Sequence, residues 1–399
     1  MNPHLQKLRP YPFEKLAKLK QGIEPPAAKP HIALSIGEPQ HPTPSLISEA
    51  LAAHLSGLTN YPATKGIPEL RLGIADWLTR RFDLPEGAVD PELQVLPCAG
   101  TREALFSFAQ CVVDPREQPL VLMPNPFYQI YEGAALLAGA EPYFLNTTRE
   151  TGYLPDFDAV PGEIWARCQL LYICSPGNPT GAVIDAATQR KLIELSSRYG
   201  FAIASDECYS ELYADEAAPP PGLLQTAYAM GNTGFERCVV FHSLSKRSNA
   251  PGLRSGFVAG DAAILKQYLL YRTYHGCALS LPVQHASLAA WRDENHVVEN
   301  RALYRRKFAA VYEILKDMLE VSMPPAGFYL WPRTPGDEQE LAKGLFAQQN
   351  VTVLPGSYLS REAHGINPGS GHVRVALVAP FDECVDAAHR IAEFVRAQG

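Results

Sequence analysis

Between residues 90 and 261, short runs of apolar residues alternate with stretches whose apolar positions recur every three or four residues. The short runs are typical of buried strands, and the longer stretches are typical of amphipathic helices. We expect seven strands, at 93–97, 120–123, 141–145, 169–175, 201–207, 238–243 and 255–261. We expect helices between them at 101–113, 127–139 and 187–200. This alternation predicts an α/β fold with a mostly parallel sheet between layers of helices.

The pattern changes after about residue 285, where a long charged helix is expected at 297–319. Two short apolar runs, 327–332 and 372–378, then predict the strands of a smaller α+β unit. The proline-rich opening has no apolar core of its own, so we expect it to pack on this unit. We therefore divide the chain into an N-terminal arm (1–44), a large domain (45–285) and a small C-terminal domain (286–399).

Composition excludes several classes of partner. The 399 residues are 46% hydrophobic and 19% charged, with a net charge of −7 and no block of like charge. Nothing therefore favours nucleic acid or an anionic membrane as a partner. A run of ~18 apolar residues and a signal peptide are both absent, which predicts a cytoplasmic protein. The eight cysteines form no CxxC pair and the eleven histidines no HExxH, so we expect reduced thiols and no metal site.

Polar residues follow several of the expected strands, at the sheet edge where ligands of parallel sheets bind. Gly100 and Thr101 open the helix after the first strand, which suits a phosphate or an ordinary helix cap. Asn178 projects from the rigid turn SPGNPTG (175–181), as an amide donor or only as part of an Asn-Pro turn. Asp206 ends an apolar strand, where it could cap a helix or hold a proton on a cationic ring.

Lys246 leaves the strand 238–243 between small hydroxyl residues, and Arg254 follows eight positions later. It could pair with a carboxylate or point to solvent. It could instead be a Schiff-base lysine, with Ser243, Ser245 and Arg254 gathered around an anion. Pyridoxal 5'-phosphate needs a lysine for its aldehyde, an acid for its ring nitrogen, a donor for its phenolic oxygen and a phosphate cradle. The strand ends supply all four groups.

With these motifs the chain resembles the class I and II aminotransferases, the fold-type I pyridoxal phosphate enzymes. The resemblance covers nearly the whole chain and is most specific at two places, SPGNPTG (175–181) and SLSK (243–246) with its downstream arginine. It extends over LSIGEPQHPTP (34–44), NYPATKGIPELR (60–71), AGTREAL (99–105), PNPFYQIYEG (124–133), SDECYSEL (205–212), GFYLW (327–331) and HVRVAL (372–377).

The resemblance implies a role for each matching residue. Lys246 would form the Schiff base and carry protons, Asp206 would hold the ring nitrogen, and Asn178 and Tyr209 would bond the phenolic oxygen. Tyr128 would stack on the ring. The phosphate would be held by Gly100, Thr101, the backbone of Arg102, Ser243, Ser245 and Arg254.

The resemblance also implies a substrate site and a homodimer with composite active sites. Arg374 would clamp the substrate α-carboxylate, with Asn178 and the Gly37 loop nearby, and Tyr61 would reach the phosphate of the neighbouring subunit. Gln40 and His41 stand where relatives often carry an acidic residue and an aromatic one. The resemblance therefore does not decide which substrate side chain the pocket accepts.

Two segments, 243–261 and 271–291, are similar to N-succinyldiaminopimelate aminotransferases of bacterial lysine biosynthesis. This similarity implies a ping-pong reaction that pairs glutamate and 2-oxoglutarate with N-succinyl-LL-2,6-diaminopimelate and its keto acid. Phe13 of the arm is expected to act as a lid. Additional donors for the distal carboxylates are expected from a loop at 271–276, namely Arg272, Tyr274 and His275.

Other functions use the same motifs. An aminotransferase for aspartate, alanine or aromatic amino acids, or a C–S β-lyase, would share every cofactor contact. A transcriptional regulator built on this domain would need a DNA-binding segment, and the arm is too short and proline-rich for one. A non-catalytic small-molecule binder would explain a pocket, but it would not explain a lysine set between serines.

Overall fold

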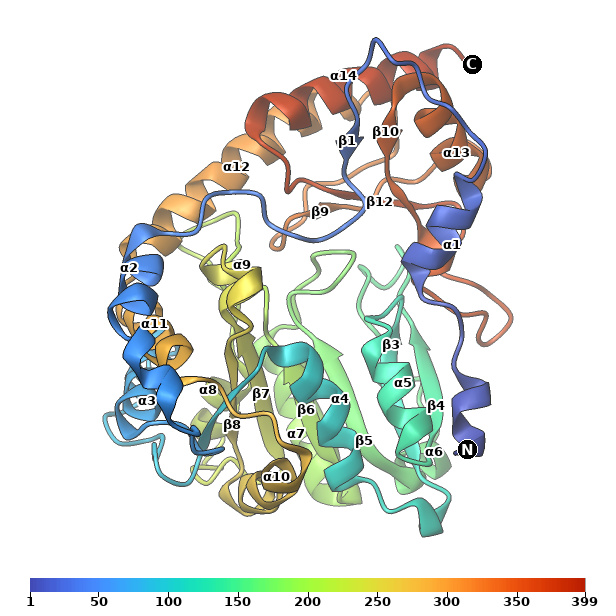
Figure 1. Cartoon of the computed structure of the whole chain (residues 1–399). Coiled ribbons are helices and arrows are strands. Elements are labelled where there is room, and N and C mark those ends of the chain that lie inside the picture. Colours follow the sequence, from blue (N-terminus) through green and yellow to red (C-terminus); the bar gives the residue numbers. More distant parts are fainter. Residues whose placement is uncertain (399) are drawn as a thin grey trace.

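The computed structural model describes residues 1–398 and is built around a seven-stranded sheet (Figure 1). The strand order is β2-β8-β7-β6-β5-β3-β4, and β8 alone runs against the others. The prediction of a mostly parallel sheet of seven strands is confirmed. Its strands are β2 (Val95–Cys98), β3 (Leu120–Asn125), β4 (Glu141–Asn146), β5 (Cys168–Cys174), β6 (Ala202–Asp206), β7 (Cys238–Ser243) and β8 (Gly256–Gly260).

Helices cover both faces of this sheet, because its central strands are apolar on both sides. In β5, Leu171 and Ile173 belong to one core cluster, and the alternate residues Leu170 and Tyr172 belong to the other. The first cluster includes residues of α3 (Pro68–Arg81), α7 (Ala186–Tyr199), α8 (Leu223–Ala229) and α11 (Leu281–Arg292). The second includes residues of α4 (Thr101–Val112), α5 (Ile130–Leu137) and α10 (Ala262–His275).

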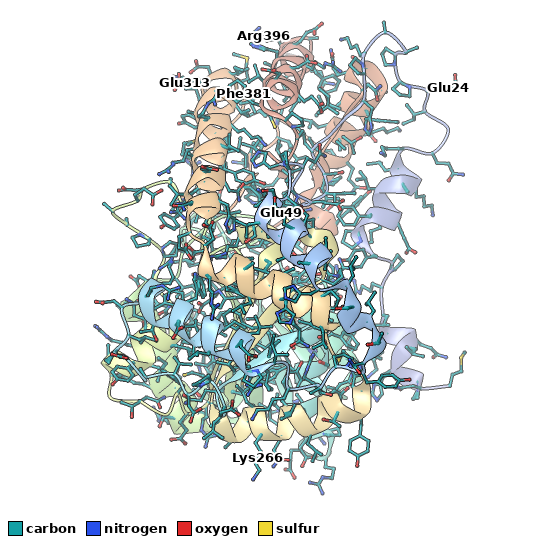
Figure 2. All side chains as sticks on the ribbon, turned by 60° about the vertical axis from the view of Figure 1, so that its left-hand side comes forward. Glu24, Glu49, Lys266, Glu313, Phe381 and Arg396 are labelled. Atoms are coloured by element: carbon teal, nitrogen blue, oxygen red, sulfur yellow. The ribbon has the colours of Figure 1, made fainter. Side chains whose placement is uncertain are left out.

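A smaller unit lies beyond the carboxyl ends of the parallel strands (Figure 1). Its sheets are β11-β12-β9 and the parallel pair β1-β10, so the chain's beginning is built into its C-terminal part. The strands are β1 (Ile32–Ala33), β9 (Tyr329–Leu330), β10 (Val351–Thr352), β11 (Leu354–Pro355) and β12 (Val373–Ala376). The helices are α12 (Asn295–Leu315), α13 (Glu338–Gln349) and α14 (Phe381–Arg396), and their side chains fill the upper part of Figure 2.

The N-terminal arm contacts both units. Its 3₁₀ helix η1 (Pro3–Lys7) packs on α5, and Leu8 reaches Gly133 of that helix. Helix α1 (Pro12–Leu19) instead buries Leu16 in a cluster with Trp331 and other residues of the small unit. The arm therefore bridges the two units; the sequence predicted that it packs on the small unit and gave no sign of the contact with α5.

The remaining elements connect and cover these parts. They are α2 (Ser45–Ala53), η2 (Leu55–Thr59), η3 (Pro115–Glu117), α6 (Gly162–Arg167), α9 (Leu244–Arg247), η4 (Pro251–Leu253) and η5 (Gly356–Tyr358). All eight cysteines are free thiols. Within residues 1–398 there is no helix with the length and apolar character needed to cross a membrane.

Candidate active site

A cavity of about 580 Å³ lies between the large sheet and the small unit. The large sheet contributes residues from its strand ends, the small unit contributes Tyr329 and Arg374, and the arm contributes Tyr11 and Phe13. The cavity is therefore assembled from segments spread over nearly the whole chain.

The topology of the sheet brings the polar strand-end residues together. Asp206 is the last residue of β6, and Lys246 lies in α9 directly after β7. Asn178 follows β5 in the next turn of the chain. Arg254 precedes β8, which runs in the opposite direction, so the start of this strand lies at the same sheet edge. All four residues line the cavity.

One end of the cavity is suited to a phosphate. Gly100 has φ +83°, and a Cβ added to it would collide with the Arg254 guanidinium, so only glycine allows this close approach. Helix α4 begins at Thr101, and its first turn has no side-chain cap, which leaves backbone N–H groups free for an anion. The hydroxyls of Ser243 and Ser245 lie 3.0 Å apart beside the same cavity.

Asp206 supplies a buried carboxylate, only 4% exposed. It accepts a hydrogen bond of 2.6 Å from the Tyr131 hydroxyl and one of 3.2 Å from the backbone N–H of Cys208. Burial raises the pKa of Asp206, and these donors act in the opposite direction by stabilising the ionised form. Such a carboxylate can hold a proton on a cationic ring nitrogen in the cavity.

Lys246 supplies an amine to the same cavity. Its Nζ donates to the backbone oxygen of Gly37, and no carboxylate of residues 1–398 lies within salt-bridge distance of it. Burial lowers the pKa of Lys246 to about 8, and the charges of Arg374 and Arg254 act in the same direction. About a tenth of this amine is therefore unprotonated and nucleophilic at pH 7, far more than for an ordinary lysine.

Arg374 supplies a cation on the small-unit side of the cavity. It donates from one nitrogen to Asn178 Oδ1 at 3.0 Å and from another to the backbone oxygen of Ser35 at 2.6 Å. Its Nε is buried without a hydrogen-bond partner in the described chain, and its guanidinium lies 4.5 Å from the centre of the Tyr329 ring. A guanidinium held in this way, with no carboxylate partner among residues 1–398, is prepared to bind a carboxylate ligand.

The cavity brings together most of the residues predicted from the sequence. They are Phe13, Gly37, Thr101, Arg102, Tyr128, Asn178, Asp206, Tyr209, Ser243, Ser245, Lys246, Arg254 and Arg374. Gly100 lies behind this lining, against Arg254. Tyr61 does not line the cavity of its own chain and is fully exposed.

The expected loop at 271–276 is wrong, because residues up to His275 continue helix α10. Arg272 is fully buried and donates to both oxygens of Glu103 at 2.9 Å, so it cannot serve as a substrate donor in the cavity of its own chain. The burial of Arg272 could not be predicted, because a charged residue on a helix usually faces solvent. Its partner, Glu103, is also far away in the sequence.

The sequence reasoning missed four residues around the cavity. Tyr131 reaches Asp206 from behind, and the Cys208 thiol lies 3.1 Å from Thr101 Oγ1. The hydroxyl of Tyr329 lies 3.0 Å from that of Tyr209, and Tyr11 lies under the Arg102 guanidinium. A signal existed for Tyr131 alone, because it lies one helical turn after the predicted Tyr128.

These residues fit pyridoxal 5'-phosphate. The anion cradle with Arg254, the buried acid Asp206 and the amine of Lys246 all line one cavity. Asn178 and Tyr209 line the same cavity and carry the polar groups that a phenolic oxygen requires. The unpaired lysine and the buried carboxylate would otherwise each be costly for the fold.

Comparisons with known proteins agree with this chemistry. The family model "Aminotransferase class I and II" matches residues 29–391. An LL-diaminopimelate aminotransferase of Nitratidesulfovibrio vulgaris (strain Miyazaki F) is 31% identical, over 97% of either chain. A crystal structure of an aminotransferase from Neisseria meningitidis Z2491 is 49% identical, with a TM-score of 0.94 over 98% of this chain and 99% of that one.

A third relative is a structure of a probable N-succinyldiaminopimelate aminotransferase from Thermus thermophilus. It is 27% identical, with a TM-score of 0.83 over 96% of this chain and all of that one. Together with the arrangement of Lys246, Asp206 and Arg374, these matches show that the chain belongs to the class I and II aminotransferases, which depend on pyridoxal phosphate.

Proposed function

We propose that this aminotransferase exchanges an amino group between glutamate and the keto acid of N-succinyl-LL-2,6-diaminopimelate. The observation that supports it most is that the cavity holds two cationic side chains, Arg374 and Arg102, besides Lys246 and Arg254. Two of the relatives above are named as aminotransferases of diaminopimelate or its N-succinyl derivative, which supports the same class of substrate. The relatives differ on the succinyl group, so this group is the point to test.

Arg374 is proposed to bind the α-carboxylate of both amino donors. Its guanidinium offers a planar fork, and it is held by Asn178 and the backbone of Ser35, so little freedom is lost when a carboxylate binds. The carboxylate would also reach the Gly37 loop, whose carbonyl oxygen accepts a hydrogen bond from the Lys246 amine.

Lys246 is proposed to move the proton between the substrate Cα and the cofactor. Its lowered pKa allows the amine to accept this proton near neutral pH and then to return it. When bound, pyridoxal phosphate supplies an electron sink for the charge that forms at Cα. Asp206 keeps the proton on the ring nitrogen, and Asn178 and Tyr209 would hold the phenolic oxygen.

Arg102 is proposed to meet a distal carboxylate of the substrate. Its Nε donates to the Tyr128 hydroxyl at 2.8 Å, and its guanidinium lies 6.0 Å from the centre of the Tyr11 ring. None of the carboxylates of residues 1–398 forms a salt bridge with it. The family resemblance implies that the backbone of Arg102 holds the cofactor phosphate. The role proposed here belongs to the side chain of Arg102, which would bind the substrate.

A direct comparison of substrates tests the proposal. Removing the succinyl group should lower kcat/KM by about one to two powers of ten, since a hydrogen bond to a charged group contributes roughly 1.5–3 kcal/mol. Arg374→Ala should impair glutamate and the succinylated substrate alike, whereas Arg102→Ala should impair mainly substrates with distal carboxylates. If aspartate, alanine or an aromatic amino acid has a higher kcat/KM than the succinylated substrate, the specific assignment fails.

We also propose that the active enzyme is a homodimer with composite sites. Tyr61 is 103% exposed, and nearby in the sequence Leu55 and Leu58 are 52% and 65% exposed, which leaves apolar surface for a second copy to cover. The test mixes Lys246→Ala subunits with Tyr61→Phe subunits under conditions where exchange is confirmed. Each heterodimer should regain one intact site, and complete inactivity of the mixture would contradict the proposal.

A further inference from the structure

A second group of reactive side chains lies outside the lining of the cavity, where the end of α10 meets the start of α4. Glu103, His275 and Cys277 each offer one ligand atom, and these three atoms all lie within 4.8 Å of one another. His275 Nδ1 is 2.8 Å from Cys277 Sγ. Helices α4 and α10 lie side by side in the lower part of Figure 1, which brings residues far apart in the sequence together.

The backbone and neighbouring side chains hold the three groups in place. His275 is the last residue of α10, and Gly276, with φ +83°, turns the chain so that Cys277 comes back beside it. The His275 ring stacks on that of Tyr271, with centres 5.6 Å apart. Little rearrangement is therefore needed to point an imidazole nitrogen and a sulfur at one atom.

Arg272 fixes the third group. It donates to both oxygens of Glu103 at 2.9 Å and to the backbone oxygen of Cys277 at 2.9 Å, so one guanidinium joins the two segments. The Glu103 side chain is still 22% exposed. Its Oε1 also accepts from the backbone N–H of Ala99 at 2.9 Å, so the lone pair left for an ion lies on Oε2. His275 is exposed and Cys277 half-buried, so an ion can reach both.

We propose that Glu103, His275 and Cys277 form a binding site for a divalent metal ion of the zinc class. One sulfur, one imidazole nitrogen and one carboxylate oxygen are the ligand types that zinc combines in tetrahedral sites, and water would complete the fourth position. The soft thiolate favours zinc over magnesium or calcium, which prefer oxygen ligands alone.

The charge balance of the step follows from the ligands. Before binding, the carboxylate of Glu103 and the guanidinium of Arg272 cancel, and the Cys277 thiol carries its proton, as a free thiol does at neutral pH. Binding forms a metal–sulfur bond and releases the thiol proton to solvent. One proton should therefore leave for each ion bound, and affinity should rise with pH.

Cobalt(II) alone, added to the cofactor-loaded enzyme, serves as the spectroscopic probe. A tetrahedral thiolate site should give intense d–d bands in the red, beyond the absorption of the cofactor, and saturate at one ion per chain with one proton released. Cys277→Ser and His275→Ala should each weaken binding at least about tenfold, as loss of a ligand does in metal sites. Zinc should displace the cobalt.

Cys111→Ser is the matched control, because Cys111 is a half-buried thiol on the same helix as Glu103 but has no such ligand group. It should bind cobalt as the wild type does. Circular dichroism should show that all variants are folded. Absence of red bands in the wild type, unchanged bands in Cys277→Ser or His275→Ala, or loss of the bands in Cys111→Ser would each overturn the proposal.

Discussion

Tyr131 is expected to control the ionisation of Asp206 from outside the cavity. Its hydroxyl donates to Asp206 Oδ2 at 2.6 Å, and both groups are buried. In Tyr131→Phe the ionised carboxylate loses a hydrogen bond worth roughly 1.5–3 kcal/mol. The pKa of Asp206, already raised by burial, should then rise by about one to two further units, at 1.36 kcal/mol per unit.

The kinetic consequence follows from the role of this carboxylate. A protonated Asp206 cannot hold the proton on the ring nitrogen, so activity is lost on the acid side of the pH profile. Tyr131→Phe should shift this acid limb upward by about one to two pH units, and kcat should fall by about ten- to hundredfold with a smaller change in KM. Steady-state rates measured across pH give both quantities.

Tyr172→Phe is the control, because it removes the same atom from the neighbouring ring. Tyr172 is fully buried, stacks on Tyr131 with centres 4.6 Å apart, and donates to the backbone oxygen of Leu105 at 2.6 Å, away from Asp206. It should lose stability and keep its pH profile. Equal losses of kcat in the two variants, or an unmoved acid limb in Tyr131→Phe, would refute the reasoning.

Two other predictions concern the amine and the fold. Because burial lowers the pKa of Lys246 to about 8 and only the neutral amine attacks an aldehyde, cofactor attachment to cofactor-free protein should accelerate up to about pH 8 and then level off. Stopped-flow absorbance measures it, and an inflection near the ordinary lysine value would contradict the assignment. Arg361 donates to both carboxylate oxygens of the buried Glu132, at 2.8 and 2.5 Å. Arg361→Ala therefore leaves Glu132 as an unpaired buried charge. Urea unfolding should show a loss of about 3–5 kcal/mol, and a loss near zero would contradict this account.

The strand-end residues could be predicted because the apolar runs mark the sheet edge directly. Asp206 and Lys246 each follow such a run, and in a parallel sheet these ends meet at one edge. The direction of β8 could not be predicted from its composition. The segment between β7 and β8 is occupied by two short helical turns, α9 and η4, and lacks the long helix that a parallel crossover normally carries.

Residues that act through a distant partner were beyond sequence patterns. Tyr131 acquires its role only through Asp206, 75 positions later, and Arg272 is buried only because Glu103 neutralises it from 169 positions away. The site for a metal proposed above depends on this same packing of α10 against α4. Neither spacing nor amphipathicity encodes such pairs, because folding over long sequence separations brings them together.

The pairing of β1 with β10 has a consequence for the order in which the chain can mature during synthesis. The strands of the large sheet, with Asp206 and Lys246, are complete once Gly260 has left the ribosome. The backbone oxygen of Ser35 accepts a hydrogen bond from Arg374, which lies 339 positions later in the chain. This contact can form only after Arg374 has been synthesised. Because domains fold as units while the chain emerges, the cofactor-binding groups can assemble first and the carboxylate clamp last. A nascent or C-terminally truncated chain would thus be able to hold the cofactor while remaining unable to grip an amino acid.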